Sequence, residues 1–139
     1  MKTHYYVEFI LFNEKTEFHD DSITNALNVV PSKVHHKGDP INRYRSYVDN
    51  IWMYSTPEEE GYNLNTHFSK MLDLFGKQVN VIRHLELTFN LIAKISVVLV
   101  IEDGEAPANT LPCEFMKFAS EIGAVVEFDI YANPYTESL

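Results

Sequence analysis

The sequence predicts an α+β domain in which helices cover one face of an antiparallel or mixed sheet, as in a ferredoxin-like sandwich or a duplicated β-α-β variant. Two observations predict this class. Segments rich in β-branched and aromatic residues alternate with segments of helical period. The first and last thirds of the chain also share the order strand, polar loop, short helix and strand. The 139 residues, of which 45% are hydrophobic, are therefore expected to form one domain over 1–139.

The N-terminal part of the chain predicts strands around one short helix. His4–Phe12 has the aromatic and β-branched content of a strand. Ser22 is expected to cap a helix that ends before Pro31, because the residue before a proline disfavours helical geometry. A short extended piece is expected around Lys33–Lys37, and a further strand over Tyr47–Ser55.

An acidic turn and two helical segments follow. Thr56–Asn63 contains proline, glycine and three consecutive glutamates, which is typical of a turn. Apolar residues then recur at helical spacing from Leu64 to Phe75, and this stripe is expected to face the core. A second helical piece is expected from Val79 to Leu85, while Leu87–Leu91 fits either a helix end or a strand.

The C-terminal part predicts one more strand, helix and strand. Ala93–Glu102 is a nearly continuous β-branched run. Pro112 is expected to open a helix in its first turn, and Gly123 to end it. The last strand is expected over Val125–Tyr131, followed by a tail at Asn133.

Composition limits the classes of partner that the protein is expected to bind and the cellular compartment that it suits. The formal net charge is −9, which repels nucleic-acid backbones and anionic membranes but allows a basic protein partner. The single cysteine, Cys113, cannot form an internal disulfide, as suits a reducing compartment. The N-terminus has the pattern of a strand rather than of a signal peptide. We expect a cytoplasmic protein with neither a nucleic-acid nor a membrane partner.

One candidate site lies on a sheet face. Side chains alternate across a strand, so Glu127, Asp129 and Tyr131 share one face of the last strand, and Val126, Phe128 and Ile130 are expected to anchor the core from the other. Glu8 lies on a face of the first strand, and Trp52 and Tyr54 share a face of the middle strand. If these faces coincide, carboxylates and aromatic rings form a surface for a ligand or a protein. Ordinary solvated residues between cross-strand aromatic pairs would give the same pattern.

A second candidate site is a basic stretch in this acidic chain. Its proposed binding residues are Lys37, Asp39, Arg43 and Arg45. Gly38 lets backbone amides approach an anion, yet the spacing of a phosphate-binding loop is missing. The favoured explanation of the stretch is an exposed hairpin whose charges offset nearby acids.

Metal and cofactor sites are not predicted. The six histidines include no His-x-x-x-His pair, and one cysteine cannot build a structural zinc site. His35 and His36 are adjacent, so on a strand they point to opposite faces. His67 lies beside the apolar helical stripe and is expected to be structural. The glycine-rich dinucleotide motif and the serine nucleophile motif are both missing, and no cofactor is expected.

Short motifs spread along the chain follow a known order and spacing. They are Ser22-Ile23-Thr24 with Leu27, Val29 and Pro31; Lys37-Gly38-Asp39; Trp52; Leu64, His67 and Leu72; Leu111-Pro112, Phe115, Ala119 and Gly123-Ala124; and Glu127-Phe128-Asp129-Ile130-Tyr131. With these motifs the chain resembles the bacterial domain-of-unknown-function family forty-two seventy-nine over nearly its whole length. The resemblance implies a stand-alone single domain and assigns no activity and no catalytic residue. A longer polar and basic insert, Pro40–Tyr47, departs from the family pattern.

Three functional hypotheses remain open. The first is a protein-binding module, an inhibitor or immunity-like partner of a basic protein, in keeping with the net charge of −9. The second is a small-ligand-binding regulatory domain with its site on an open sheet face or at a dimer interface. The third is an enzyme that uses Glu8, Asp129 or Tyr131. The missing catalytic motifs favour binding over catalysis, and Val125–Tyr131 would also allow a two-fold homodimer through a sheet edge.

Overall fold

Strands and helices alternate along the chain. The computed structural model describes residues 2–108 and 110–135. Over these residues the elements are β1 (His4–Asn13), α1 (Asp20–Leu27), β2 (Lys33–His35), β3 (Asn50–Ser55), β4 (Glu59–Glu60), α2 (Asn65–Phe75), α3 (Val79–Phe89), β5 (Ile92–Ile101), α4 (Cys113–Glu121) and β6 (Val125–Ala132). The order of strands and helices thus agrees closely with the pattern of residue types along the sequence.

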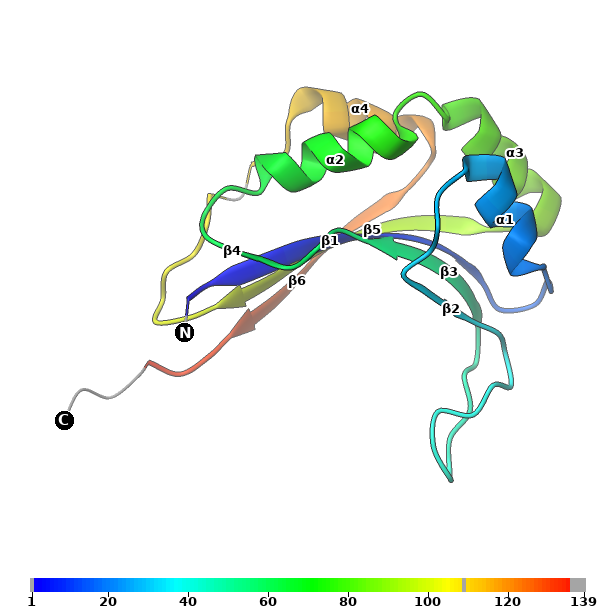
Figure 1. Cartoon of the computed structure of the whole chain (residues 1–139), viewed down its shortest axis with the longest axis horizontal. Helices are drawn as coiled ribbons and strands as arrows, with labels where there is room; N and C mark the ends of the chain where they lie inside the picture. Colours follow the sequence, from blue (N-terminus) through cyan, green and yellow to red (C-terminus); the bar gives the residue numbers. More distant parts are fainter. Residues whose placement is uncertain (1, 109, 136–139) are drawn as a thin grey trace.

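The strands form one mixed sheet. Its order is β2-β3-β1-β5-β6, and β4 pairs with the first residues of β1, beyond the end of β3. β1 is antiparallel to both β3 and β5, whereas β6 is parallel to β5. All four helices lie on one face of the sheet, as Figure 1 shows. The predicted α+β class with helices on one face is confirmed.

Two features go beyond a plain β-α-β-β-α-β order. Both α2 and α3 lie in the connection that leads to β5, and α4 followed by β6 adds one more strand at the edge. A parallel neighbour requires a crossover connection, and α4 supplies it between β5 and β6. β6 therefore ends the sheet on one side and β2 on the other.

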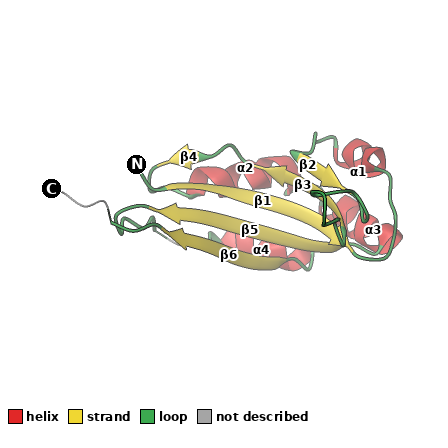
Figure 2. Ribbon diagram, turned by 90° about the horizontal axis from the view of Figure 1, so that it is seen from below, coloured by secondary structure: helices red, strands yellow, loops and turns green. Residues whose placement is uncertain are grey.

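The core lies between the sheet and the helices. Alternate residues of β1 are buried toward the helices, from Tyr5 to Leu11. Phe9, at the centre of this row, stacks on Phe75 of α2 with ring centroids 4.4 Å apart. The predicted stripe of α2 is buried, in keeping with its expected place in the core. The opposite face of β1, β5 and β6 has no helix over it, as Figure 2 shows from below.

Helix ends differ from the predictions in two places, and a segment left open between helix and strand is resolved. α1 begins at Asp20 after His19, so the expectation that Ser22 caps it is wrong. Pro112 is the residue before α4 rather than its first residue, with extended backbone angles. The ambiguous segment continues α3 to Phe89, and Asn90 ends the helix in the left-handed region at φ 54°. An asparagine tolerates this conformation better than most residues, and glycine is the residue more often found there.

Regular pairing occurs in the predicted acidic turn and in the basic insert. Glu59–Glu60 forms the short strand β4 within the acidic turn. The basic insert folds back on itself, with an antiparallel bridge between Pro40 and Ser46. Among the described residues, none of the helices combines the length and apolar character that crossing a bilayer would require.

Candidate functional site

The helix-free face of the sheet carries a row of acidic and hydroxyl side chains. Strand register places Glu8 opposite Ser96, and Ser96 opposite Glu127. The next row runs from Tyr6 through Val98 to Asp129. Glu8, Glu127 and Asp129 therefore share this face, as their alternation along the strands predicted. We call them the acidic row.

The acidic row is linked to neighbouring side chains. Lys94 Nζ lies 3.2 Å from Glu127 Oε2, and the Tyr131 hydroxyl donates a hydrogen bond of 3.0 Å to Asp129 Oδ2. Partial burial raises the pKa of Glu8, nearby Asp129 raises it further, and Lys94 lowers it. The pKa of Tyr131 is raised because its hydroxyl is hydrogen-bonded to the Asp129 carboxylate. The face thus carries excess negative charge that a cation would relieve.

Trp52 and Tyr54 lie on the other face, so the expectation that they join the acidic row is wrong. Register places Trp52 opposite Leu11 and Tyr54 opposite Phe9, both of which point toward the helices. Trp52 is fully buried, and its Nε1–H donates to Thr24 Oγ1 at 3.1 Å. Tyr54 packs edge-on against a ring of α2. Both aromatic rings belong to the helix-covered side of the sheet.

β6 is covered less than the sequence predicted. Val126 packs against the core, but Phe128 is 40% exposed and Ile130 is 50% exposed. The expectation that all three anchor the core is wrong for the last two. β6 is the outermost strand and has a neighbouring strand on only one side in the described sheet. Its apolar side chains therefore remain partly open to solvent on the helix side.

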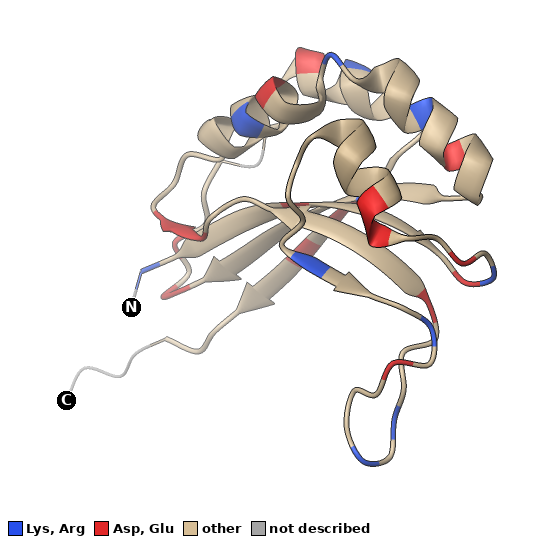
Figure 3. Ribbon diagram, turned by 45° about the vertical axis from the view of Figure 1, so that its right-hand side comes forward, with Lys and Arg blue, Asp and Glu red and all other residues tan. Residues whose placement is uncertain are grey.

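The basic stretch forms a hairpin between β2 and β3, which we call the basic hairpin (37–49). It projects on the side of the sheet away from the helices, as Figures 1 and 3 show. Gly38 N–H donates to Tyr47 O and Tyr47 N–H donates to Asp39 O, each at 2.9 Å. At the tip, Asn42 Oδ1 accepts hydrogen bonds from the backbone N–H groups of two following residues. These bonds hold the hairpin in a defined shape.

The four proposed binding residues of the hairpin do not come together. Arg43 and Arg45 are exposed at the tip, beside Tyr44, which is 86% exposed. Lys37 and Asp39 lie at the base, where Asp39 Oδ2 accepts the backbone N–H of His36 at 2.9 Å. This bond gives Asp39 a structural use within the turn. The hairpin therefore presents its positive charge mainly at its tip.

A cavity of about 490 Å³ lies beside the base of the hairpin. The residues that line it come from the β1–α1 loop, the hairpin and β3: Glu17, Phe18, His19, His36, Lys37 and Asn50. His36 Nε2 lies 2.6 Å from Asp20 Oδ1, which joins hairpin and helix at this point. Sequence reasoning missed this cavity because it forms between segments far apart in the chain.

The adjacent histidines His35 and His36 do not come together at one metal-binding position. His35 Nε2 lies 2.7 Å from Asp49 Oδ1, whereas His36 is paired with Asp20. Within the part of the chain that the structure describes, no group of three histidine, cysteine, aspartate or glutamate side chains could hold a metal ion. The carboxylates of the acidic row do not line the cavity beside the base of the hairpin.

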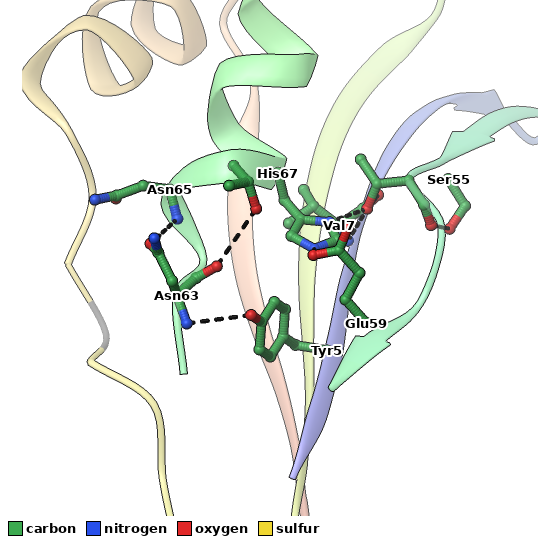
Figure 4. A network of polar contacts seen from close by, with 9 residues as sticks. Tyr5, Val7, Ser55, Glu59, Asn63, Asn65 and His67 are labelled. Atoms are coloured by element: carbon green, nitrogen blue, oxygen red, sulfur yellow. Dashed lines mark hydrogen bonds and ion pairs between the residues drawn. The ribbon is translucent and has the colours of Figure 1, made fainter. Parts of the chain in front are cut away.

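A buried polar cluster surrounds His67 at the start of α2, as Figure 4 shows. His67 Nδ1 lies 2.6 Å from Thr56 Oγ1, and Nε2 lies 3.3 Å from Glu59 Oε2. Burial lowers the pKa of His67, although Glu59 acts in the opposite direction. The buried hydrogen bond between His67 Nδ1 and Thr56 fits the predicted structural role of this histidine. The acidic turn and the helix start are separate motifs in sequence, so only their contact reveals this cluster.

Comparison with known proteins gives a family and no function. No curated protein and no solved structure matches the chain. The family model described as Domain of unknown function (DUF4279) matches residues 3–133, which include every element of the sheet and all four helices. This span contains the acidic row, the basic hairpin and the His67 cluster. The chain therefore belongs to the DUF4279 family.

Proposed function

We propose that this protein is a protein-binding domain that captures an extended segment of a basic partner along β6. The observation that carries the proposal is the state of β6. This edge strand of eight residues has half-exposed apolar side chains on the helix side and acidic side chains on the helix-free side. An unprotected edge is a template for another strand, whose main-chain hydrogen bonds provide affinity.

The side chains of β6 define the partner's chemistry. A strand added beside β6 would place alternate residues next to Glu127 and Asp129, and the intervening residues next to Phe128 and Ile130. The complementary segment alternates lysine or arginine with apolar residues. A net charge of −9 would also accelerate encounter with a basic partner, as in an inhibitor or immunity-like pair.

The same charges disfavour pairing of β6 with a second copy of this chain. An antiparallel pair centred on Phe128 would place Glu127 of one copy opposite Asp129 of the other. A register centred on Glu127 or on Asp129 would oppose identical acids. Like charges directly opposite one another destabilise a strand pair. A homodimer through β6 is therefore a weaker proposal than a complex with a basic partner.

The test is a titration of isotope-labelled protein with a short peptide of alternating lysine and valine. Amide resonances of Val125–Ala132 should shift, and a peptide of the same composition with its lysines grouped at one end should shift them less. Neutralising the two acids of β6 with Glu127→Gln and Asp129→Asn removes two ion pairs with the peptide of about 0.7 kcal/mol each, so affinity should fall about tenfold at low salt.

The matched control changes the same charge elsewhere. Asp73→Asn with Glu114→Gln neutralises two exposed acids on α2 and α4. These changes should leave peptide affinity within about twofold, because the charges lie on the helix layer. The proposal fails if both double variants weaken binding equally, or if the peptide shifts resonances away from β6.

A second candidate function is a small-ligand-binding regulatory domain, favoured by the cavity of about 490 Å³. Its volume suits a small metabolite. Lys37 provides a cation, Glu17 an anion, and Phe18 an apolar surface. A zwitterion such as an amino acid suits this set. A panel of amino acids that leaves the melting temperature unchanged in both the parent protein and Lys37→Ala would rule out this function.

A further inference from the structure

The imidazole of His67 is held between a buried hydroxyl and a solvent-facing carboxylate. The residue is 3% exposed, and Tyr5 packs edge-on against its ring with centroids 5.1 Å apart. Thr56, in the linker after β3, lies on the Nδ1 side, and Glu59 of β4 lies on the Nε2 side (Figure 4). The ring is therefore fixed in orientation by groups from three different elements.

Hydrogen bonding to Thr56 determines which ring nitrogen carries the proton in the neutral imidazole. Thr56 Oγ1 accepts the Val7 N–H at 2.9 Å, so its own hydrogen is free to be donated. The nearest acceptor is His67 Nδ1 at 2.6 Å, against 3.4 Å for Val7 O. Nδ1 then acts as the acceptor and Nε2 carries the hydrogen. The protein thereby presents a buried N–H donor on the Nε2 side.

This donor has no well-aligned acceptor. Glu59 Oε2 is 3.3 Å from Nε2, yet Nε2 makes no hydrogen bond of good geometry within the described residues. A buried donor left in this state is costly, so a better placed acceptor would be favoured. Glu59 is 53% exposed and belongs to a strand of two residues, which leaves its side chain free to turn toward solvent.

His67 and Glu59 border a small cleft of about 170 Å³. Its other lining residues are Pro57, Thr66 and Lys70. Lys70 lowers the pKa of His67, which reflects the closeness of its positive charge. The Thr66 hydroxyl donates to Asn63 O at 3.5 Å. The first turn of α2 contains no acidic residue, so the positive end of an 11-residue helix is not neutralised there. The unpartnered His67 N–H and positive charge therefore lie around a space the size of one functional group.

We propose that this cleft is a carboxylate-binding site and that Glu59 is its tethered resident anion. A carboxylate from a small acid or from the C-terminus of a peptide would accept a hydrogen bond from His67 Nε2–H and would pair with Lys70. Glu59 would turn outward as the ligand enters. The cleft is smaller than the pockets that enclose whole metabolites, so it would hold the carboxylate group alone. This site is independent of β6 and of the partner proposed above.

The test removes the tethered competitor and adds acetate at constant ionic strength, with chloride as the balancing anion. In Glu59→Ala, acetate should shift the side-chain resonances of His67 and Lys70. It should bind at least about tenfold more tightly than to the parent protein, because an intramolecular carboxylate competes at high effective concentration. Glu60→Ala removes the neighbouring exposed acid, which does not line this cleft, and should bind acetate as the parent protein does.

Further variants and anions make the outcome decisive. Lys70→Ala, an exposed position, should weaken acetate binding in the Glu59→Ala background without loss of folding. A short peptide with a free C-terminus that binds more tightly than acetate, while its amidated form does not bind, would assign the site to peptide ends. Equal affinity of peptide and acetate would assign it to small acids. The proposal is overturned if acetate leaves His67 unshifted in the folded Glu59→Ala variant, if Glu60→Ala behaves like Glu59→Ala, or if inorganic phosphate binds as tightly as acetate.

Discussion

Replacing Asn50 with alanine should weaken the joint between β1, the β1–α1 loop and the basic hairpin. Asn50 is 2% exposed at the start of β3. Its side-chain amide donates to Asn13 Oδ1 at 2.9 Å and to Thr16 O at 3.3 Å, and its Oδ1 accepts the Lys37 N–H at 2.9 Å. One side chain therefore connects three segments that are distant in sequence.

The expected loss of stability is about 2–5 kcal/mol. Asn13 is also buried, so its Oδ1 would lose its partner without gaining water, at about 1–3 kcal/mol. The Thr16 carbonyl and the Lys37 amide lie nearer the surface and can be hydrated, so each adds about 0.5–1 kcal/mol. A domain of this size is stable by about 5–15 kcal/mol, so the change is a large fraction of the total.

Urea unfolding, monitored by Trp52 fluorescence, measures this loss of stability. The midpoint should fall, and the slope of the free energy of unfolding against urea concentration should stay unchanged. The double variant Asn13→Ala with Asn50→Ala should cost less than the sum of the single variants, because it leaves no orphaned amide from this pair. Asn25→Ala on the exposed side of α1 is the control and should change stability by less than about 0.5 kcal/mol. A cost below about 0.5 kcal/mol for Asn50→Ala, or strict additivity in the double variant, would refute the reasoning.

Three further predictions concern the His67 cluster, the core and the hairpin. Burial lowers the pKa of His67 in the folded state, so below about pH 6.5 the unfolded state binds a proton at this imidazole more readily than the folded state does. As the pH is lowered from about 6.5 toward the lowered pKa, the free energy of unfolding should therefore decrease. His67→Gln should reduce that slope in urea unfolding measured across the range, and an unchanged slope would contradict the prediction. Thr24→Val should cost about 1–3 kcal/mol by leaving the Trp52 indole N–H without an acceptor, while Thr24→Ser should recover most of it in the same assay. Gly38→Ala should cost about 1–2 kcal/mol, seen as a lower melting temperature by circular dichroism, because φ is +93° at Gly38 although no atom lies within 4 Å of the added methyl; a neutral result would show that the turn relaxes.

Much of the secondary structure could be predicted because each element carries its own period. The apolar stripe of α2 recurs at helical spacing over eleven residues, and β5 is a nearly continuous β-branched run. Ends were harder to place. Ser22 is a common capping residue, yet the residue before α1 is His19, three residues earlier, since the chain enters the helix from the loop around Phe18, which is buried in the core.

The candidate site could be predicted in part. Alternation placed Glu127 and Asp129 on one face of β6, and that face proved to be free of helices. The same argument failed for Trp52, because alternation does not say which of two faces the helices will cover. It failed again for Phe128, whose exposure depends on how far the helix layer extends over the edge strand.

The sequence by itself determined the α+β class, the family, the net charge of −9 and the sets of residues that share a face within each strand. These are local or additive properties, set by backbone geometry and by counting charges. Only the tertiary structure decided strand order, the place of β6 as the outermost strand of the described sheet, and the meeting of Thr56, Glu59 and His67 around a cleft. Such features depend on contacts between distant segments, and the free energy of those contacts comes from burying helices against the sheet as a whole.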